Sequence, residues 1–325
     1  MSLNKFITFG FIALATLNLP PPAIAQTQST CSPEERKQFA LTAVDKEGGV
    51  IESLRGEHLR LKVGGSPATI SEVVFHAKYP MDLAVLIDTS TSQEVVLPIA
   101  KAAARAFVTS LATQGQDRVA VVSFADTPVY LQSLTSDLSG TAAAIDRIEP
   151  VIPTGYIGGG VIVGHRPPPP GSLLGSTSLW DTVASATTEL FRSKTDNRRR
   201  AVLLFTDGRD TSSSSKLKVI TEQAIKHDVA IFAIGLVDPD DEVSYIEEHN
   251  LKKLSEQTGG VARYPGEKKV KLEAALTEIG RRLRGSYVVG YCGGAAKERP
   301  KLQLEVVDPE MRKAKPVLTY KRYQQ

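Results

Sequence analysis

The sequence predicts an α/β fold: a doubly wound, mostly parallel sheet inserted into a small β-sandwich that strands from both chain ends form. Between residues 80 and 284, short apolar runs alternate with stretches whose apolar residues recur every three or four positions. Strands that alternate with helices need crossover connections, which give parallel strands with helices on both faces. The sandwich is predicted because residues 38–76 and 286–320 contain strand-like runs without helical periodicity between them.

The β segments at the two chain ends consist of short apolar runs separated by turn sequences. The runs are Phe39 to Val44, Leu59 to Val63 and Thr69 to Phe75 in the first segment, and Tyr287 to Tyr291, Leu302 to Val307 and Pro316 to Tyr320 in the second. Isolated hairpins cannot bury their apolar faces. We therefore expect residues 26–79 and 285–325 to pack together, with two separate β appendages as the alternative.

The central segment, residues 80–284, begins with a nearly continuous apolar run from Leu83 to Ile87, which is typical of a strand buried on both faces. Further strands are expected at Arg118 to Phe124, Val129 to Leu131, Ala201 to Thr206, Val229 to Ile234 and Val261 to Tyr264. Helices are expected at Val96 to Leu111, Leu138 to Ile148, Leu179 to Phe191, Lys216 to His227, Val243 to Thr258 and Lys269 to Leu283. Pro128 indicates that the strand following it lies at a sheet edge.

The first 25 residues have the pattern of a secretory signal peptide. Lys5 precedes an apolar segment from Phe6 to Leu19, and Ala23-Ile24-Ala25 forms a small-x-small cleavage site before Gln26. An uncleaved anchor is the alternative, although the apolar segment is short for a membrane span. Because no later run approaches spanning length, we expect an exported mature chain, periplasmic or extracellular, without a membrane span.

Charge and cysteine content narrow the classes of partner. The formal net charge is only +3 over 325 residues, which gives no general preference for nucleic acid. Arg198 to Arg200 directly precede an apolar run, and we expect them to form a solvated turn. Cys31 and Cys292 are the only cysteines. They can pair in an oxidising compartment, but sequence does not establish their proximity, so a disulfide and two unpaired thiols both remain open.

Polar residues with oxygen-bearing side chains lie at the ends of predicted elements. Asp88, Ser90 and Ser92 follow the first buried strand, Asp207 follows the strand that ends at Thr206, and Thr177 precedes a helix. In open α/β sheets the carboxyl ends of the strands border the ligand crevice. Carboxylates and hydroxyls are hard donors, which suit a hard divalent cation such as Mg²⁺. The pattern therefore predicts a metal site at this sheet edge.

Three motifs in this order resemble the metal-ion-dependent adhesion site of von Willebrand factor type A domains. They are Asp-x-Ser-x-Ser from Asp88, Gly-x-Thr-x-Leu from Gly175, and Thr206-Asp207-Gly208. The resemblance covers residues 80–284, and the flanking β segments look like a bacterial group of exported von Willebrand factor A-related proteins.

The resemblance implies a set of metal ligands and a function. Ser90, Ser92 and Thr177 would offer hydroxyls to Mg²⁺ or Mn²⁺, and Asp88 and Asp207 would complete the site directly or through water. An acidic side chain of a protein partner would take an open coordination position. The implied function is a non-enzymatic protein-binding or adhesion module.

Asp181 and Gln93 lie close in sequence to the predicted metal ligands. Asp181 lies four positions after Thr177, so it faces the same way on the predicted helix and is a candidate supporting carboxylate; a solvated helical carboxylate is the alternative. Gln93 stands where many of these domains have methionine, and we expect it to affect packing behind the loop.

The glycine- and proline-rich stretch from Gly155 to Gly175 is expected to lie at the rim of the crevice and to help select the partner.

Alternative readings exist for the motifs and for the function. Asp88 to Ser92 alone can be a helix cap, and Asp207-Gly208 alone can be an ordinary turn. A structural or assembly scaffold with a vestigial metal site would share every fold feature. A metal-dependent hydrolase or phosphotransferase is the remaining alternative, although an aspartyl phosphotransferase would need a second carboxylate where Ser90 stands.

Overall fold

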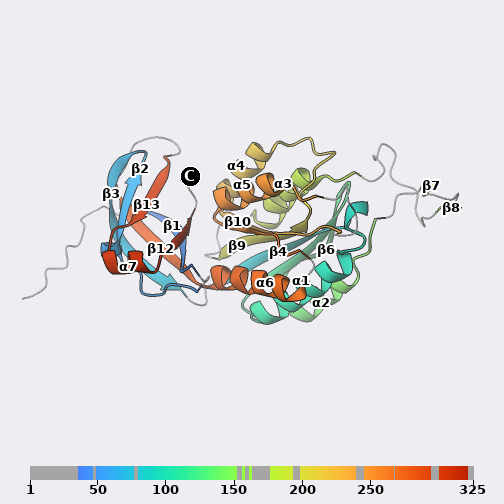
Figure 1. The fold of residues 1–325 in the computed structure, drawn as a ribbon, viewed down its shortest axis with the longest axis horizontal. Helices are drawn as coiled ribbons and strands as arrows, with labels where there is room; N and C mark the ends of the chain where they lie inside the picture. The colour runs from blue at the N-terminus through green and yellow to red at the C-terminus, as the bar shows by residue number, and fades with distance from the viewer. Residues whose placement is uncertain are drawn as a thin grey trace, which may run out of the picture.

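The structure is a computed structural model that describes residues 36–46, 49–76, 80–151, 156–157, 161–162, 176–192, 198–238, 245–266, 268–293 and 300–320. The described residues fold into an α/β domain and a separate antiparallel β domain (Figure 1). None of their helices is both long and apolar enough to cross a membrane. The predicted signal peptide, residues 1–25, lies outside the described residues.

The α/β domain contains a six-stranded sheet in the order β11-β10-β9-β4-β5-β6. Its strands are β4 (Met81–Asp88), β5 (Arg118–Phe124), β6 (Pro128–Thr135), β9 (Arg199–Thr206), β10 (Val229–Gly235) and β11 (Ala262–Arg263). All neighbours are parallel except β6, the edge strand that runs antiparallel to β5. This confirms the predicted mostly parallel sheet with a strand behind Pro128 at its edge.

Six helices cover the two faces of this sheet. One face carries α1 (Leu97–Leu111), α2 (Leu138–Asp146) and α6 (Lys269–Arg284), and the other carries α3 (Leu179–Leu190), α4 (Leu217–Lys226) and α5 (Glu248–Thr258), as Figure 1 shows. Leu83, Val85 and Ile87 of β4 pack toward the first group, whereas Ala84 and Leu86 pack toward the second. A strand that is buried on both faces explains the continuous apolar run in the sequence.

Strands from both ends of the chain form the second sheet, in the order β13-β2-β3-β12-β1-β14. They are β1 (Lys37–Val44), β2 (Leu59–Val63), β3 (Ser66–His76), β12 (Ser286–Cys292), β13 (Leu302–Val306) and β14 (Val317–Tyr320). Each pair of neighbours is antiparallel, and β12 lies between β1 and β3. Packing of the two chain ends into one unit, with the α/β domain inserted between them, therefore agrees with the predicted fold class.

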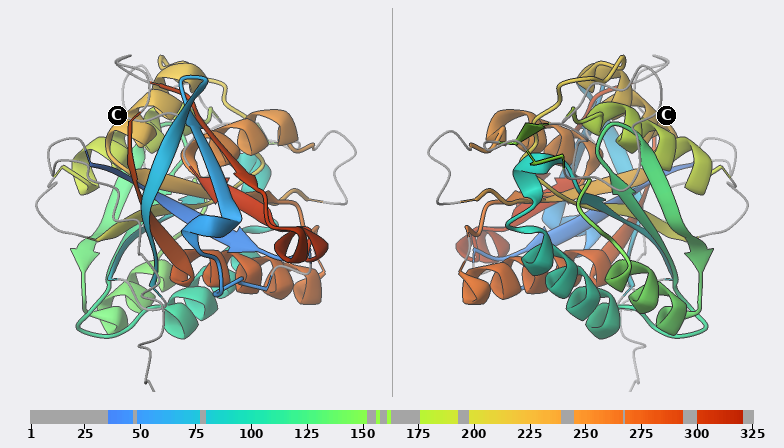
Figure 2. Two further views of the ribbon diagram at one scale, coloured as in Figure 1. Left: turned by 90° about the vertical axis from the view of Figure 1, so that its left-hand side faces the viewer. Right: turned by 90° about the vertical axis from the view of Figure 1, so that its right-hand side faces the viewer.

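The two layers of the predicted sandwich are two parts of one curled sheet. Its edge strands approach each other, because the Leu304 N–H donates a 2.9 Å hydrogen bond to the Tyr320 hydroxyl. All six strands contribute to a single apolar core that includes Leu41, Leu61 and Tyr291. The left view of Figure 2 looks onto this sheet from the side opposite the α/β domain.

Two helices differ from the predictions. The helix expected from Val243 begins at Glu248, because the Glu247 N–H donates to the Asp207 carbonyl at 2.8 Å and the chain is held against the loop after β9. A short helix, α7 (Pro309–Lys313), was not expected. Its signal is present in the sequence: Asp308 caps the helix by accepting from the Met311 N–H at 2.8 Å, and proline follows at the first helical position.

The prediction that Arg198 to Arg200 form a solvated turn was wrong. Arg198 Nε lies 2.7 Å from a carboxylate oxygen of Asp82, and Arg200 is buried with Nη1 3.1 Å from the His227 carbonyl. Both partners belong to the α/β domain, and they hold these arginines at the start of β9, so this segment is not a solvated turn.

Cys292, at the end of β12, is disulfide-bonded. Cys31 lies outside the described residues, so the Cys31–Cys292 pairing stays a prediction.

Candidate metal centre

The site lies at the carboxyl ends of the neighbouring strands β4 and β9. The parallel register pairs Ile87 with Phe205, so Asp88 and Asp207 leave the sheet side by side. Both aspartates are almost completely buried, with 2% and 1% of their surfaces exposed. The two strand ends thus bring together carboxylates that are far apart in the sequence.

Two serine hydroxyls connect these strand ends. Ser92 Oγ donates a 2.8 Å hydrogen bond to Asp207 Oδ2, and Ser90 Oγ lies 3.2 Å from Ser92 Oγ. The Ser90 N–H donates to Asp88 Oδ1 at 2.9 Å. Asp88, Ser90, Ser92 and Asp207 therefore form one hydrogen-bonded cluster, which we call the aspartate–serine cluster.

Thr206 holds the Asp88 carboxylate through a hydrogen bond, a role that the sequence did not lead us to predict. Its hydroxyl donates to Asp88 Oδ2 at 2.6 Å and accepts from the Gly208 N–H at 3.0 Å. The signal was available in the sequence, because Thr206 is the polar residue that ends the apolar run of β9. This threonine fixes both the orientation of Asp88 and the start of the turn after Asp207.

The turn after β9 fixes the second carboxylate. The Arg209 N–H donates to Asp207 Oδ1 at 2.9 Å, while Ser92 occupies Oδ2. Gly208 has φ +84°, and a Cβ there would lie 2.8 Å from the Leu251 side chain. Only glycine fits this turn without strain, which explains the Asp207-Gly208 pair in physical terms.

The electrostatics of the cluster favour a bound cation. Burial and then the negative charge of Asp207 raise the pKa of Asp88 to about 7, although hydrogen bonds from Thr206 and Ser90 oppose the shift. Burial also raises the pKa of Asp207, against hydrogen bonds from the Arg209 N–H and the Ser92 hydroxyl and against the positive charge of Arg209. Two buried like charges are costly unless a positive charge compensates them.

Thr177 reaches the same region through its backbone. It precedes α3 and is buried; its N–H donates to Thr211 Oγ1 at 2.8 Å, and its carbonyl accepts from the N–H groups of Thr211 and Ser212 at 2.9 and 3.1 Å. Thr177 is thereby bound to the loop that carries Asp207. Among the described residues, the structure gives no hydrogen bond between its hydroxyl and the aspartate–serine cluster.

The serines on either side of Thr177, which the sequence reasoning missed, anchor it to the turn between β5 and β6. Ser176 Oγ donates to Asp126 Oδ1 at 2.8 Å, and Ser178 Oγ donates to the Asp126 carbonyl at 2.6 Å. The Ser178 N–H also donates to the Ala125 carbonyl at 2.7 Å. Thr177 is therefore held between two loops at the same edge of the sheet.

Asp181 binds the loop after β9, and within the described part of the chain it forms no hydrogen bond with the aspartate–serine cluster. Its two carboxylate oxygens accept from the N–H groups of Ser214 and Ser215 at 2.8 and 2.9 Å. Burial raises the pKa of Asp181, but these hydrogen bonds outweigh it and the net shift is downward. Asp181 is thus an ionised carboxylate that orders the loop carrying Thr211, one step removed from Thr177.

Gln93 lies behind the cluster. It is 2% exposed, and its amide Nε2 donates to the Leu236 carbonyl at the end of β10 at 3.2 Å. This position ties the loop after β4 to a third strand. The glycine- and proline-rich stretch expected at the rim lies almost entirely outside the described residues.

The residues present fit a hard divalent cation. Within the described chain there is no group of three or more His, Cys, Asp or Glu side chains suited to a metal. The cluster instead combines two buried carboxylates with neutral hydroxyls, and all its side-chain donors are oxygens. Oxygen donors with one or two carboxylates are typical of magnesium sites.

The comparisons agree with this geometry. Two family models, both described as von Willebrand factor type A domain, match residues 83–209 and 172–270. The chain therefore belongs to the von Willebrand factor type A domain proteins. No curated protein matches the chain in sequence.

Solved structures share the fold at low sequence identity. Proximal thread matrix protein 1 from the mussel byssus is 19% identical, with a TM-score of 0.51, and the match covers 68% of this chain and 50% of that one. Another structure of the mussel protein, with a zinc-occupied MIDAS motif, is 20% identical over 66% of this chain and 49% of that chain, with a TM-score of 0.49. A von Willebrand factor type A protein from Catenulispora acidiphila is 12% identical, covers 84% of this chain and 71% of that chain, and has a TM-score of 0.48. The chain thus spans about half the length of the mussel protein.

Proposed function

We propose that this chain is an exported, non-enzymatic protein-binding module that holds Mg²⁺ or Mn²⁺ at the aspartate–serine cluster and binds an acidic side chain of its partner there. One observation carries the proposal. Asp88 and Asp207, two almost completely buried carboxylates from neighbouring strands, are held together through the hydroxyls of Ser90 and Ser92.

Each residue has a role in this proposal. Asp88 and Asp207 would neutralise the dication, and the hydroxyls of Ser90, Ser92 and Thr177 would add neutral oxygen donors. A bound dication supplies an electrophilic centre that prefers an incoming anion, because neutral hydroxyls leave its charge only partly satisfied. Thr206 and the Arg209 N–H keep the carboxylates oriented, so the chain does not have to rearrange to receive the ion.

The sequence supports the cellular setting of the proposal. A signal peptide over residues 1–25 would export the chain, and the oxidising compartment that follows suits a disulfide-bonded Cys292. The sequence argues against an aspartyl phosphotransferase, because Ser90 stands where such an enzyme would need a second carboxylate.

Metal-dependent capture of a partner tests the proposal. Immobilised protein with Mn²⁺ is exposed to the exported fraction of its source, and bound protein is then eluted with EDTA and identified. We expect the same captured protein to be absent from an Asp88→Ala column and present on a Glu189→Gln column, because Glu189 is an exposed carboxylate paired with Arg192. Equal capture by Asp88→Ala, or capture that persists in EDTA, would support a scaffold whose metal site is vestigial.

A further inference from the structure

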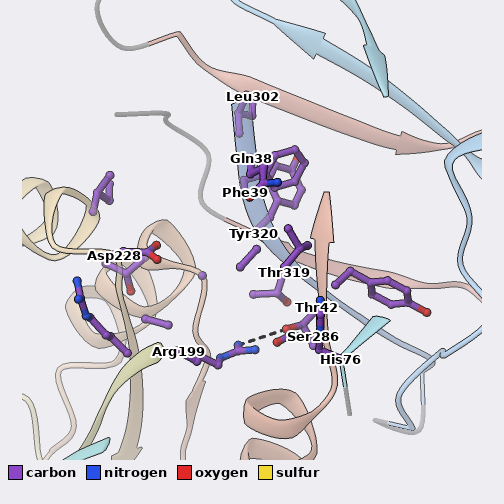
Figure 3. A pocket seen from close by; sticks show the side chains of 18 of the residues that line it. Gln38, Phe39, Thr42, His76, Arg199, Asp228, Ser286, Leu302, Thr319 and Tyr320 are labelled. Atoms are coloured by element: carbon purple, nitrogen blue, oxygen red, sulfur yellow. Dashed lines mark hydrogen bonds between the residues drawn. The ribbon is translucent and has the colours of Figure 1, made fainter. Parts of the chain in front are cut away.

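A cavity lies between the two domains, at the end of the α/β sheet opposite the aspartate–serine cluster. It has a volume of about 380 Å³ and is lined by β1, β12 and β14 of the β domain, the start of β9, and the turn between α4 and β10 (Figure 3). This volume is within the range of small-molecule sites. The cavity therefore has the size of a ligand pocket, and its charged groups indicate which ligand it suits.

Arg199, the second residue of β9, points its guanidinium across the cavity toward the β domain (Figure 3). Its Nη2 makes one long contact, 3.5 Å, with the Thr42 hydroxyl of β1. Its Nη1 is buried and has no hydrogen-bond partner. Burial lowers the pKa of Arg199 to about 10. Among the described residues, the guanidinium thus has a buried nitrogen without a hydrogen-bond partner and no carboxylate paired with it.

Ser286, the first residue of β12, places a second unused group at the same wall. Ser286 is 7% exposed, and its Oγ is buried without a hydrogen-bond partner. Figure 3 shows it beside Thr42, close to the Arg199 guanidinium. Buried polar groups in native proteins are nearly always paired, so two unpaired donors on one cavity wall indicate a missing acceptor.

The other charged groups on the cavity wall do not satisfy Arg199. Arg198 is paired with Asp82, and Arg200 binds the His227 carbonyl. Asp228 is the acidic residue of the lining, and Figure 3 shows it well apart from the Arg199 guanidinium. The pocket therefore carries net positive charge, and an anion is the ligand that this charge favours.

We propose that this cavity binds a small organic anion whose carboxylate or phosphate head is held by Arg199 and Ser286. Arginine presents a planar fork that matches both kinds of oxyanion, and the Ser286 hydroxyl adds a further donor. Phe39, Leu302 and Tyr320 form an apolar part of the wall, which accommodates the body of the ligand. The anionic head defines the chemical class of the ligand. The apolar wall favours an organic anion over a bare inorganic ion.

The pocket is separate from the proposed metal centre. Arg199 lies at the amino end of β9 and Asp207 just beyond its carboxyl end, so roughly 26 Å of strand separates them at about 3.3 Å per residue. The two sites also use different side chains throughout. A variant of the pocket is therefore expected to leave divalent-cation binding unchanged, which serves as the test of folding.

The experiment measures binding of three probes to the full chain by calorimetry and ligand-observed NMR. Benzoate and phenyl phosphate carry the two kinds of head on the same ring, and benzyl alcohol is the neutral control. We expect saturable binding of at least one anion and none of benzyl alcohol. Arg199→Gln should weaken binding at least tenfold and Ser286→Ala several-fold, whereas Arg192→Gln, an exposed arginine paired with Glu189, should not change it. Whichever of benzoate and phenyl phosphate binds more tightly shows whether the pocket prefers a carboxylate or a phosphate head.

A second measurement separates a ligand-binding role from a structural one. Without ligand, Arg199→Met removes an uncompensated buried charge and keeps much of the side-chain volume, so its melting temperature should exceed that of the wild type. A melting temperature at or below the wild-type value would show that the guanidinium stabilises the domain contact, and would overturn the proposal. The proposal is also overturned if neither anion binds, if benzyl alcohol binds equally well, or if Arg199→Gln binds with wild-type affinity.

Discussion

Ser92 Oγ donates a 2.8 Å hydrogen bond to Asp207 Oδ2 across 115 positions of sequence. This bond joins the loop after β4 to the turn after β9, and it orients a hydroxyl and a carboxylate toward the same point. Ser90 extends the link toward Asp88. The site is therefore assembled by the parallel pairing of two strands, which sets the relative position of both loops.

The first prediction concerns this link. Ser92→Ala removes one proposed ligand and the bond that orients Asp207, so the affinity for Mn²⁺ should fall by about tenfold or more, or roughly 1.4 kcal/mol. The fold should be retained, because Ser92 is not a core residue. Calorimetric titration measures the change. Ser110→Ala on α1, which removes a hydroxyl bonded within its own helix, is the control and should bind Mn²⁺ as the wild type does.

The second prediction concerns pH. The pKa of Asp88 is raised from 3.8 to about 7 in the folded chain, so between these values the folded state without metal holds a proton that the unfolded state has released. The metal-free protein should therefore lose stability as pH rises from about 4 to 7, and the loss is on the order of 2–4 kcal/mol. The raised pKa of Asp207 acts in the same direction.

Urea unfolding in the presence of a chelator, at pH 5.5 and pH 8, measures this effect. Asp88→Asn cannot titrate, so its stability should depend less on pH than that of the wild type. If the wild type is instead more stable at pH 8 than at pH 5.5, burial and the charge of Asp207 do not raise the pKa of Asp88 in the folded chain.

The third prediction separates Asp181 from the cluster. Asp181→Ala leaves the Ser214 and Ser215 N–H groups without their acceptor and should cost about 1–2 kcal/mol of unfolding free energy. The Mn²⁺ affinity should fall less than in Asp88→Ala, since Asp181 acts through the loop that holds Thr177. Thermal unfolding and calorimetry of the two variants give the comparison. Equal losses of affinity would place Asp181 among the metal ligands.

The fourth prediction concerns the shared β domain. Deleting residues 286–325 removes β12, which lies between β1 and β3, and exposes the apolar side chains of Leu41 and Leu61. The truncated chain should aggregate, because open strand edges and apolar surface promote association. Light scattering measures the extent of aggregation. Deletion from Val317 onward removes only the edge strand β14 and should have a milder effect; a soluble, fully stable product of the larger deletion would contradict the account.

Much of the fold could be predicted because its signals are local. The apolar run of β4 and the helical periodicity after it depend on burial alone, and they gave the parallel sheet with its two helical faces. Helix α7 and Thr206 also left local signals, a cap with proline and a polar residue at the end of an apolar strand.

Other features depend on contacts that a single sequence does not record. Arg199 and Ser286 meet because two domains pack together, so nothing near either residue in the sequence indicates their proximity. Arg198 and Arg200 are likewise withdrawn from solvent by partners distant in the sequence, Asp82 and the His227 carbonyl. For the site, Asp88, Ser90, Ser92 and Asp207 form one hydrogen-bonded cluster. The bonds from Ser176 to Asp126 and from the Thr177 N–H to Thr211 depend on loop packing, which a single sequence does not record.

Direct titration of the chelator-treated chain with Mn²⁺ and Mg²⁺ tests the central claim. The account predicts one saturable site per chain in the wild type, its loss in Asp88→Ala, and its retention in Asp146→Ala, which removes an exposed carboxylate paired with Arg105. Circular dichroism should show that all three proteins are folded. A folded wild-type chain that binds neither ion, or an Asp88→Ala chain that binds Mn²⁺ with unchanged affinity, would contradict the account.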